Sequence, residues 1–211
     1  MDNKGILIVV SGFSGSGKGT LMKVLLEKYN NYALSISATT RKPREGEVEG
    51  VHYFYKSVEE FEKMIAKDEL IEYARYVNNY YGTPRNYVES QLNAGKDVIL
   101  EIEIQGALKV KNKYPETLLL FVTPPDAGTL ERRLVGRGTE TPDVIKSRML
   151  RAAEEADGMD AYDYLIVNDD IEECRDEVHR IIQSEHCRCS RNTEFMNQIK
   201  EELRGNLKGE L

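Results

Sequence analysis

Four short aliphatic runs recur along the chain, and each is nearly continuous rather than alternating with polar residues. They span residues 5–11 (GILIVVS), 97–103 (DVILEIE), 117–122 (TLLLFV) and 163–168 (DYLIVN). Such runs are typical of strands that are buried on both faces of a sheet. Stretches with helical spacing separate most of them, the first at residues 18–29. This alternation predicts an α/β fold, in which helices cover both faces of a parallel sheet.

The stretch from residue 37 to 87 breaks this alternation and is rich in Tyr, Glu, Thr and Gly. We interpret it as a small inserted α+β lobe. Within it, Ser57 and Glu60 have the spacing of a capping box and predict a helix start. Thr-Pro pairs at 83–84 and 141–142 predict two further helices, which end at Gly95 and near Gly158.

These signals predict one domain over residues 1–211. Residues 136–143 (GRGTETPD) are polar and are expected to form a lid loop. The expected core comprises 1–36, 88–125 and 159–183, the inserted lobe 37–87, and the lid 126–158. Residues 184–211 are polar with one weak helical pattern, so we interpret them as a C-terminal appendix.

Composition narrows the possible partners. The formal net charge of −7 argues against nucleic acid as the main partner, because phosphate backbones favour basic surfaces. No apolar run approaches eighteen residues, so we expect no membrane span, and we interpret the apolar N-terminus as a strand rather than a signal peptide. The three cysteines predict a reducing compartment, with the cytoplasm as the default.

Residues 186–189 (HCRC) raise the question of a zinc site. Three potential ligands within four residues have poor geometry, and no second cluster completes a set of four. We interpret Cys187 and Cys189 as exposed thiols and expect no metal bound by protein side chains there. Zinc binding is the alternative.

A glycine-rich segment follows the first aliphatic run and precedes the first helical stretch. It matches the phosphate-binding pattern G-x-x-x-x-G-K-[ST], except that Gly19 occupies the hydroxyl position. Its expected ATP-binding residues are Gly12, Phe13, Ser14, Gly15, Ser16, Gly17, Lys18, Gly19 and Thr20. Backbone N–H groups and Lys18 would bind phosphate, while Mg²⁺ would rely on phosphates and water. The alternative is an ordinary strand-to-helix turn.

A second anion-binding site is indicated just after the second expected strand. Arg41 and Arg44 lie three residues apart, with hydroxyl side chains before them and Tyr53 after them. Arginine binds phosphate oxygens in a bidentate manner, and tyrosine adds a donor. Taken alone, the segment would be interpreted as a solvated polar loop. Its position directly after the second strand, near the edge of the sheet where α/β sites form, favours phosphate binding instead.

Five segments together resemble guanylate kinase, in order and with compatible spacing over about residues 5–183: SATTRKPREGEVEGVHY, NYYGTPRNYV, EIEIQGA, RLVGRGTETPDVIKSRM and LIVNDD. The resemblance implies the reaction ATP + GMP → ADP + GDP in purine metabolism, with Mg²⁺ accompanying ATP. It also implies a phosphate-loop core, a GMP-binding lobe and a lid. Whether dGMP is an equal acceptor, and the oligomeric state, stay open.

The resemblance also implies roles for residues of the lobe. Those implied to bind GMP are Ser37, Arg41, Arg44, Tyr53, Glu72, Tyr81, Thr83, Glu101 and Glu103. Guanine presents N1–H and N2–H side by side, so the Glu72 carboxylate could accept both, and Thr83 could donate to O6. Many relatives have aspartates at the two positions that end the third buried strand, where this chain has Glu101 and Glu103. Without its neighbours, Glu72 would be interpreted as a surface acid.

Lys18, Arg133, Arg137 and Arg148 are the implied catalytic residues, because phosphoryl transfer depends on positioning and charge stabilisation. Arg132 and Arg151 are interpreted as part of a solvated helix face. Asn168 matches a family residue beside adenine, and the alternative is a turn residue. Two rival functions are a catalytically inactive module that binds phosphopeptides, and a kinase for another nucleoside monophosphate.

Overall fold

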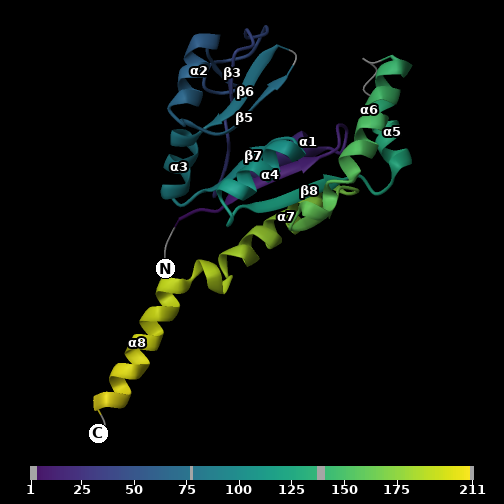
Figure 1. Cartoon of the computed structure of the whole chain (residues 1–211). Helices are drawn as coiled ribbons and strands as arrows, with labels where there is room; N and C mark the ends of the chain where they lie inside the picture. The colour runs from purple at the N-terminus through teal and green to yellow at the C-terminus, as the bar shows by residue number, and fades with distance from the viewer. Residues whose placement is uncertain (1–3, 77, 137–140, 210–211) are drawn as a thin grey trace.

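The central element of the molecule is a five-stranded parallel sheet (Figure 1). The computed structural model describes residues 4–76, 78–136 and 141–209. Across the sheet the strands are β2 (Tyr32–Leu34), β7 (Asp97–Glu101), β1 (Leu7–Gly12), β8 (Leu118–Thr123) and β9 (Tyr164–Val167). The predicted α/β class is therefore confirmed, and all four aliphatic runs form strands. One boundary differs, because β7 ends at Glu101 and Glu103 instead precedes the next helix.

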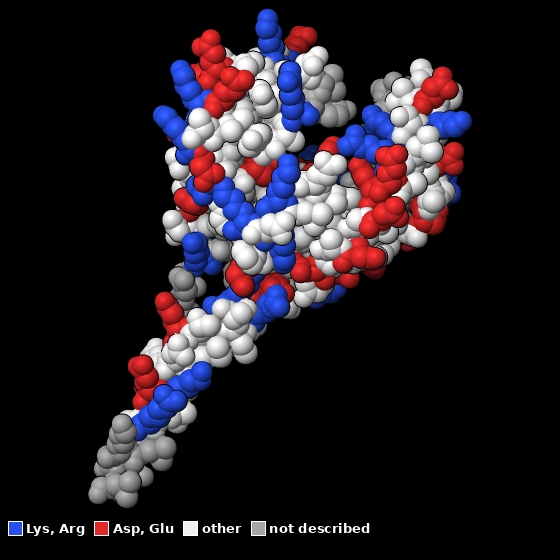
Figure 2. Space-filling model, in the orientation of Figure 1, with Lys and Arg blue, Asp and Glu red and all other residues white. Residues whose placement is uncertain are grey.

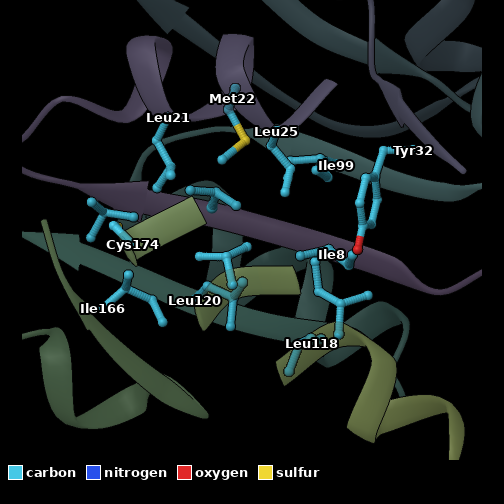
Figure 3. Close-up of a cluster of buried hydrophobic side chains, with 14 of the residues drawn as sticks. Ile8, Leu21, Met22, Leu25, Tyr32, Ile99, Leu118, Leu120, Ile166 and Cys174 are labelled. Carbon is cyan, nitrogen blue, oxygen red and sulfur yellow. The ribbon is translucent and has the colours of Figure 1, made fainter. Parts of the chain in front are cut away.

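Helices cover both faces of this sheet, which explains why its strands are apolar on both sides. On one face lie α1 (Lys18–Lys28) and α7 (Ile171–His186). Leu21, Leu25 and Cys174 from these helices pack against Ile8 and Leu120 of the sheet (Figure 3). The opposite face carries α3 (Arg85–Asn93) and α4 (Ile104–Lys113), which contribute the buried side chains Val88, Leu92, Ala107 and Val110.

A separate four-stranded sheet builds the inserted lobe. Its strands, in spatial order, are β4 (Phe54–Tyr55), β3 (Ala38–Thr39), β6 (Asn79–Pro84) and β5 (Leu70–Tyr76). Helix α2 (Val58–Ala66) packs Phe61 against Ala38 and Leu70. The Ser57 hydroxyl accepts from the Glu60 N–H while the Glu60 carboxylate accepts from the Ser57 N–H, so the predicted capping box is confirmed.

Two helices, α5 (Ala127–Val135) and α6 (Pro142–Ala156), lie side by side next to the central sheet (Figure 1). Their residues Leu130, Leu134 and Ala152 form a small core with Phe13 and Phe121. A short 3₁₀ turn, η1 (Met159–Ala161), leads from α6 to β9. We refer to α5 and α6 as the lid helices. Half of the predicted lid loop, residues 137–140 with Arg137 among them, lies outside the described residues.

Helix α7 continues past residue 184, where we expected the core to end. Glu185 is 3% exposed, and the ring Nε2 of His186 lies 2.9 Å from Oδ1 of the buried Asp97. The same Asp97 oxygen accepts from the Ile6 N–H at 2.8 Å. A 3₁₀ turn, η2 (Cys189–Arg191), follows, and only α8 (Thr193–Gly209) projects from the body (Figure 1). Residues 184–192 therefore pack against the core.

Cys174 is buried and Cys187 and Cys189 are exposed, and all three are free thiols. Among the described residues, no group of three or more His, Cys, Asp or Glu side chains could hold a metal ion. Within the same residues, no helix is both long and apolar enough to cross a membrane.

Candidate functional site

The glycine-rich segment forms the turn from β1 into α1, as the pattern predicted. Gly12 has φ +151°, and a Cβ atom there would lie 2.0 Å from the carbonyl oxygen of Val122. A side chain at this position would therefore displace the neighbouring strand. Lys18 is the first residue of α1, and its Nζ donates to the carbonyl oxygens of Gly12 at 2.6 Å and Phe13 at 3.0 Å. The ammonium group thus lies along the inner side of the loop.

Away from Lys18, the loop is fixed by hydrogen bonds to the carbonyl oxygen of Ser16. That oxygen accepts from Asn168 Nδ2 at 2.8 Å and from Arg133 Nη1 at 3.4 Å. Arg133 also donates from Nη2 to the carbonyl oxygen of Asn168 at 2.9 Å. Asn168 is 3% exposed, and a Cβ atom on Gly17 would lie 2.4 Å from its Nδ2. Asn168 therefore supports the loop directly, and the adenine contact implied for it stays a prediction.

Two arginines of α6 reach across to the core. Arg148 Nη1 donates to Ser14 Oγ at 2.9 Å, so a lid helix contacts the phosphate loop. Arg151 Nη2 donates to Glu103 Oε2 at 2.9 Å, and its Nε donates to Glu155. Arg151 is exposed, as expected for a solvated helix face, and its ion pairs with Glu103 and Glu155 additionally place it on the wall of the site. Arg132 does lie on an exposed face, where it bonds Thr129.

The loop, the lobe and the lid helices together enclose one hollow of about 630 Å³. Its walls include Lys18 from the core, Ser37 and Tyr53 from the lobe, and Arg148 from α6. Figure 2 shows the cleft between the lobe and the lid helices, with basic and acidic side chains on its walls. A second hollow of about 390 Å³ adjoins it and extends into the lobe. The two share Ser37, Tyr53, Glu101, Ile102 and Glu103.

Glu72 on β5 lines the second hollow, and the fully buried Thr83 lies beside it on the neighbouring strand β6. Thr83 Oγ1 donates to Glu72 Oε1 at 2.8 Å. The register shifts between Leu70 and Tyr73, and an irregularity of this kind redirects the side chains within it. Burial raises the pKa of the Glu72 carboxyl above its usual value, while the Thr83 bond and Lys109 act in the opposite direction. The pocket therefore presents an acceptor pair with one oxygen already oriented.

In the lobe, Arg41 and the backbone of Arg44 both bind Glu47, an acid that the sequence analysis did not single out. The guanidinium of Arg41 lies 5.3 Å from the ring centre of Tyr53, and the Tyr53 ring lies 6.2 Å from that of Tyr81. Arg41 Nη2 donates to Glu47 Oε1 at 2.8 Å. The Arg44 side chain is exposed, while its backbone N–H donates to Glu47 Oε2. The only sequence signal for Glu47 was an acid among basic residues.

Glu101 ends β7 beside the loop, and Glu103 occupies the residue just before α4 without a capping hydrogen bond from its side chain. Although Glu101 keeps contact with solvent, the surrounding protein partly desolvates its carboxyl and raises its pKa, with Lys18 opposing that shift. Glu103 is bound to Arg151. Both carboxylates therefore face the cleft, but from different backbone contexts. At α4, Gln105, Gly106 and Lys109 also line the second hollow, and the sequence analysis did not single them out.

Comparisons with known proteins match these features. A family model described as guanylate kinase matches residues 4–185. The chain is 52% identical over 201 residues to a guanylate kinase of Bacillus cereus, covering 95% of this chain and 98% of that protein. It is also 52% identical to guanylate kinase of Halalkalibacterium halodurans, covering 94% and 97%. The crystal structure of guanylate kinase from Anaplasma phagocytophilum is similar with a TM-score of 0.70, 35% identity and 89% coverage of both chains.

Proposed function

Because the chain belongs to the guanylate kinase family, and so transfers a phosphoryl group from ATP to GMP, we propose that the two adjoining hollows hold the two substrates of this reaction. GMP lies in the lobe, with its base in the second hollow. The phosphates of ATP lie on the loop between β1 and α1. The observation that carries this proposal is that Lys18 and Tyr53 line one hollow, while Glu72 and Thr83 bond each other near the adjoining one.

The acceptor is recognised at both of its ends. The Glu72 carboxylate accepts the N1–H and N2–H donors of guanine. The Thr83 hydroxyl donates its single hydrogen to Glu72 and so orients that carboxylate, which replaces the expected donation from Thr83 to O6. Arg41, Arg44, Tyr53 and Tyr81 bind the 5′-phosphate, because guanidinium groups match phosphate oxygens and tyrosine hydroxyls add donors. Ser37 lies on the wall between the two hollows, which supports a contact to the nucleotide.

The donor phosphates are held by the loop and by the lid arginines. Residues 12–20 supply backbone N–H groups, and the N-terminus of α1 favours negative charge. Lys18, Arg133 and Arg148 approach the loop, and such groups stabilise the charge that spreads over the transferred phosphoryl group. The catalytic role of Arg137 rests on the family resemblance alone. Asn168 contributes by keeping the Ser16 peptide in place and by its implied contact to adenine.

The acidic residues of the cleft fit a magnesium ion that arrives with ATP. Gly19 offers no hydroxyl, but Glu101 and Glu103 provide carboxylate oxygens on the wall of the same hollow as Lys18. Mg²⁺ retains several waters when bound, so these carboxylates would hold it through water. When bound, the ion would neutralise charge on the phosphates of ATP. We also propose that the protein acts in the cytoplasm, in keeping with its three free thiols, and without nucleic acid, in keeping with its net charge of −7.

The assignment of the two phosphate sites is tested by Arg44→Ala. The variant should raise KM for GMP strongly and leave KM for ATP within about twofold, since Arg44 belongs to the acceptor site. Steady-state assays of ADP release with GMP, AMP, UMP and no acceptor measure both the sites and the base preference. An equal loss of ATP affinity would mean that the two sites are exchanged. If the wild-type protein released ADP with AMP or UMP as fast as with GMP, a kinase for another nucleoside monophosphate would be favoured. If it released no ADP with any acceptor, a catalytically inactive binding module would be favoured.

A further inference from the structure

We propose that Glu47 is a positioning residue for the acceptor phosphate: its carboxylate holds the Arg41 guanidinium and the backbone at Arg44 in the arrangement that receives the phosphate of GMP. The inference rests on the proposed assignment of those two arginines. Glu47 itself contacts neither reacting atom in this scheme. It acts through the residues that bind the phosphate.

Both oxygens of the Glu47 carboxylate are engaged, and each has a distinct task. Oε1 accepts from Arg41 Nη2 at 2.8 Å. Oε2 accepts from the backbone N–H of Arg44 at 2.7 Å and from the hydroxyl of Tyr55 at 2.8 Å. One carboxylate therefore joins the guanidinium, the loop backbone and strand β4, and the Tyr55 contact fixes the whole group to the lobe sheet.

This ion pair is more enclosed than most pairs at the protein surface. The side chains of Arg41 and Glu47 are only 16% and 17% exposed. Hydrogen bonds from Arg41 first, and then from the Arg44 backbone, lower the pKa of Glu47 to about 2. The carboxylate therefore stays ionised at neutral pH and keeps its hold on the guanidinium. A charge-assisted pair with good geometry and little solvent orders an otherwise flexible side chain.

The ordered guanidinium keeps donors for a phosphate. Guanidinium carries five N–H donors, and the described contacts use one on Nη2 for Glu47 and one on Nη1 for the Lys42 carbonyl oxygen at 2.8 Å. The ring of Tyr53 lies against one face of the group and limits its rotation further. Preordering of this kind lowers the entropy that GMP binding would otherwise cost. A carboxylate near a phosphate also repels it. Removal of the Glu47 charge should therefore raise KM for GMP if positioning dominates, and lower it if repulsion dominates.

The test compares Glu47→Gln with Glu49→Gln in steady-state kinetics and thermal unfolding. Glu49 lies in the same loop and accepts from the Tyr55 N–H at 2.8 Å, but its described bonds include neither arginine. Glu47→Gln should raise KM for GMP roughly 10–100-fold, the range for loss of a charge-assisted bond, with KM for ATP within about twofold. Glu49→Gln should leave KM for GMP near the wild-type value. Tyr55→Phe removes one contact and should give a smaller rise, which keeps the test open if Glu47→Gln does not fold.

Arg41→Ala separates failure of this inference from failure of the site assignment. A KM for GMP that rises in Arg41→Ala but stays level or falls in Glu47→Gln and Tyr55→Phe would overturn the positioning role and leave the phosphate site intact. If Arg41→Ala also leaves KM for GMP unchanged, the assignment of Arg41 to the acceptor phosphate fails, and the role of Glu47 fails with it. A parallel rise in the KM values of both substrates in Glu47→Gln would indicate a general structural role and would also overturn the inference.

Discussion

The hydroxyl of Thr83 donates to the carboxylate of Glu72 across strands β5 and β6 at 2.8 Å, and Glu72 lines the hollow that we assign to guanine. Thr83 is fully buried. The bond occupies Oε1, and it fixes the direction in which the carboxylate presents its remaining lone pairs. In the proposed site, two adjacent strands of the lobe therefore orient the carboxylate that reads the base.

Replacing Glu72 by glutamine should impair GMP and spare ATP. Glutamine keeps the shape but places an N–H₂ donor where guanine also presents a donor. Loss of one charged hydrogen bond costs about 1.5–3 kcal/mol, so kcat/KM for GMP should fall by about 10–100-fold or more. Assays with GMP and AMP in wild type and variant measure this change. Full GMP activity and unchanged selectivity in Glu72→Gln would show that Glu72 does not read the base.

The pH dependence of GMP binding should respond to Thr83. Burial raises the pKa of Glu72, and the Thr83 bond lowers it again by favouring the ionised form. In Thr83→Val that pKa should rise further, so GMP binding should weaken at a higher pH than in wild type as the pH falls. Thr83→Ser keeps the hydroxyl and serves as the control. Profiles of kcat/KM for GMP between pH 5 and 8 provide the measurement, and superimposable acid limbs in Thr83→Val and wild type would contradict it.

Lys18 should matter for the chemical step more than for stability. Lys18→Ala removes a preorganised positive charge from the loop, and loss of one such donor typically lowers kcat by about 10²–10³. Lys23→Ala on the same helix is the matched control, because within the described part of the chain Lys23 makes only an exposed pair with Glu27 at 3.9 Å. Single-turnover rates with saturating ATP and GMP should separate the two variants. Near-normal turnover in Lys18→Ala would remove the loop lysine from the mechanism.

Two truncations should differ sharply at the C-terminus. A chain that ends at Gln183 loses His186, which contacts the buried Asp97 at 2.9 Å, and also loses the buried Glu185. A hydrogen bond to a charged group contributes about 1.5–3 kcal/mol, so Tm should fall by about 3–12 °C. A chain that ends at Asn192 loses only α8 and should keep both its Tm and its activity. Equal melting temperatures for the two chains would show that residues 184–192 contribute nothing to the core.

Local patterns predicted the parts of the molecule that depend on nearby residues. The phosphate loop, the Ser57–Glu60 capping box and the aliphatic strands are each determined by residues a few positions apart in the sequence. The end of β7 was misplaced because the aliphatic run extends through Ile102 to Glu103 in the sequence, although the chain is already turning into α4. A run of apolar residues does not show at which residue a strand ends and the next helix begins.

The missed contacts depend on the tertiary fold. Arg151 and Glu103 are 48 residues apart, and only the packing of α6 beside the cleft brings them together. Glu47 is close to Arg41 in sequence, but its third partner, Tyr55, lies on a strand whose register no local pattern fixed. Similarly, the C-terminal boundary was set too early because the polar stretch after Ser184 hides the buried Glu185. Composition alone does not distinguish a polar residue in an ion-pair network from one in solvent.

Asp97 binds the Ile6 N–H and His186 at the N-terminal ends of the parallel strands, whereas the phosphate loop lies at their C-terminal ends. The first strand and the last helix of the body, α7, are therefore joined on the side away from the loop. Parallel strands all begin on that side and all deliver their functional loops to the other. Helix α8 then leads the C-terminus away from the body (Figure 1). A protein fused to this end, or a surface to which it is attached, would stand clear of the nucleotide cleft and leave the lobe and lid helices room to approach each other.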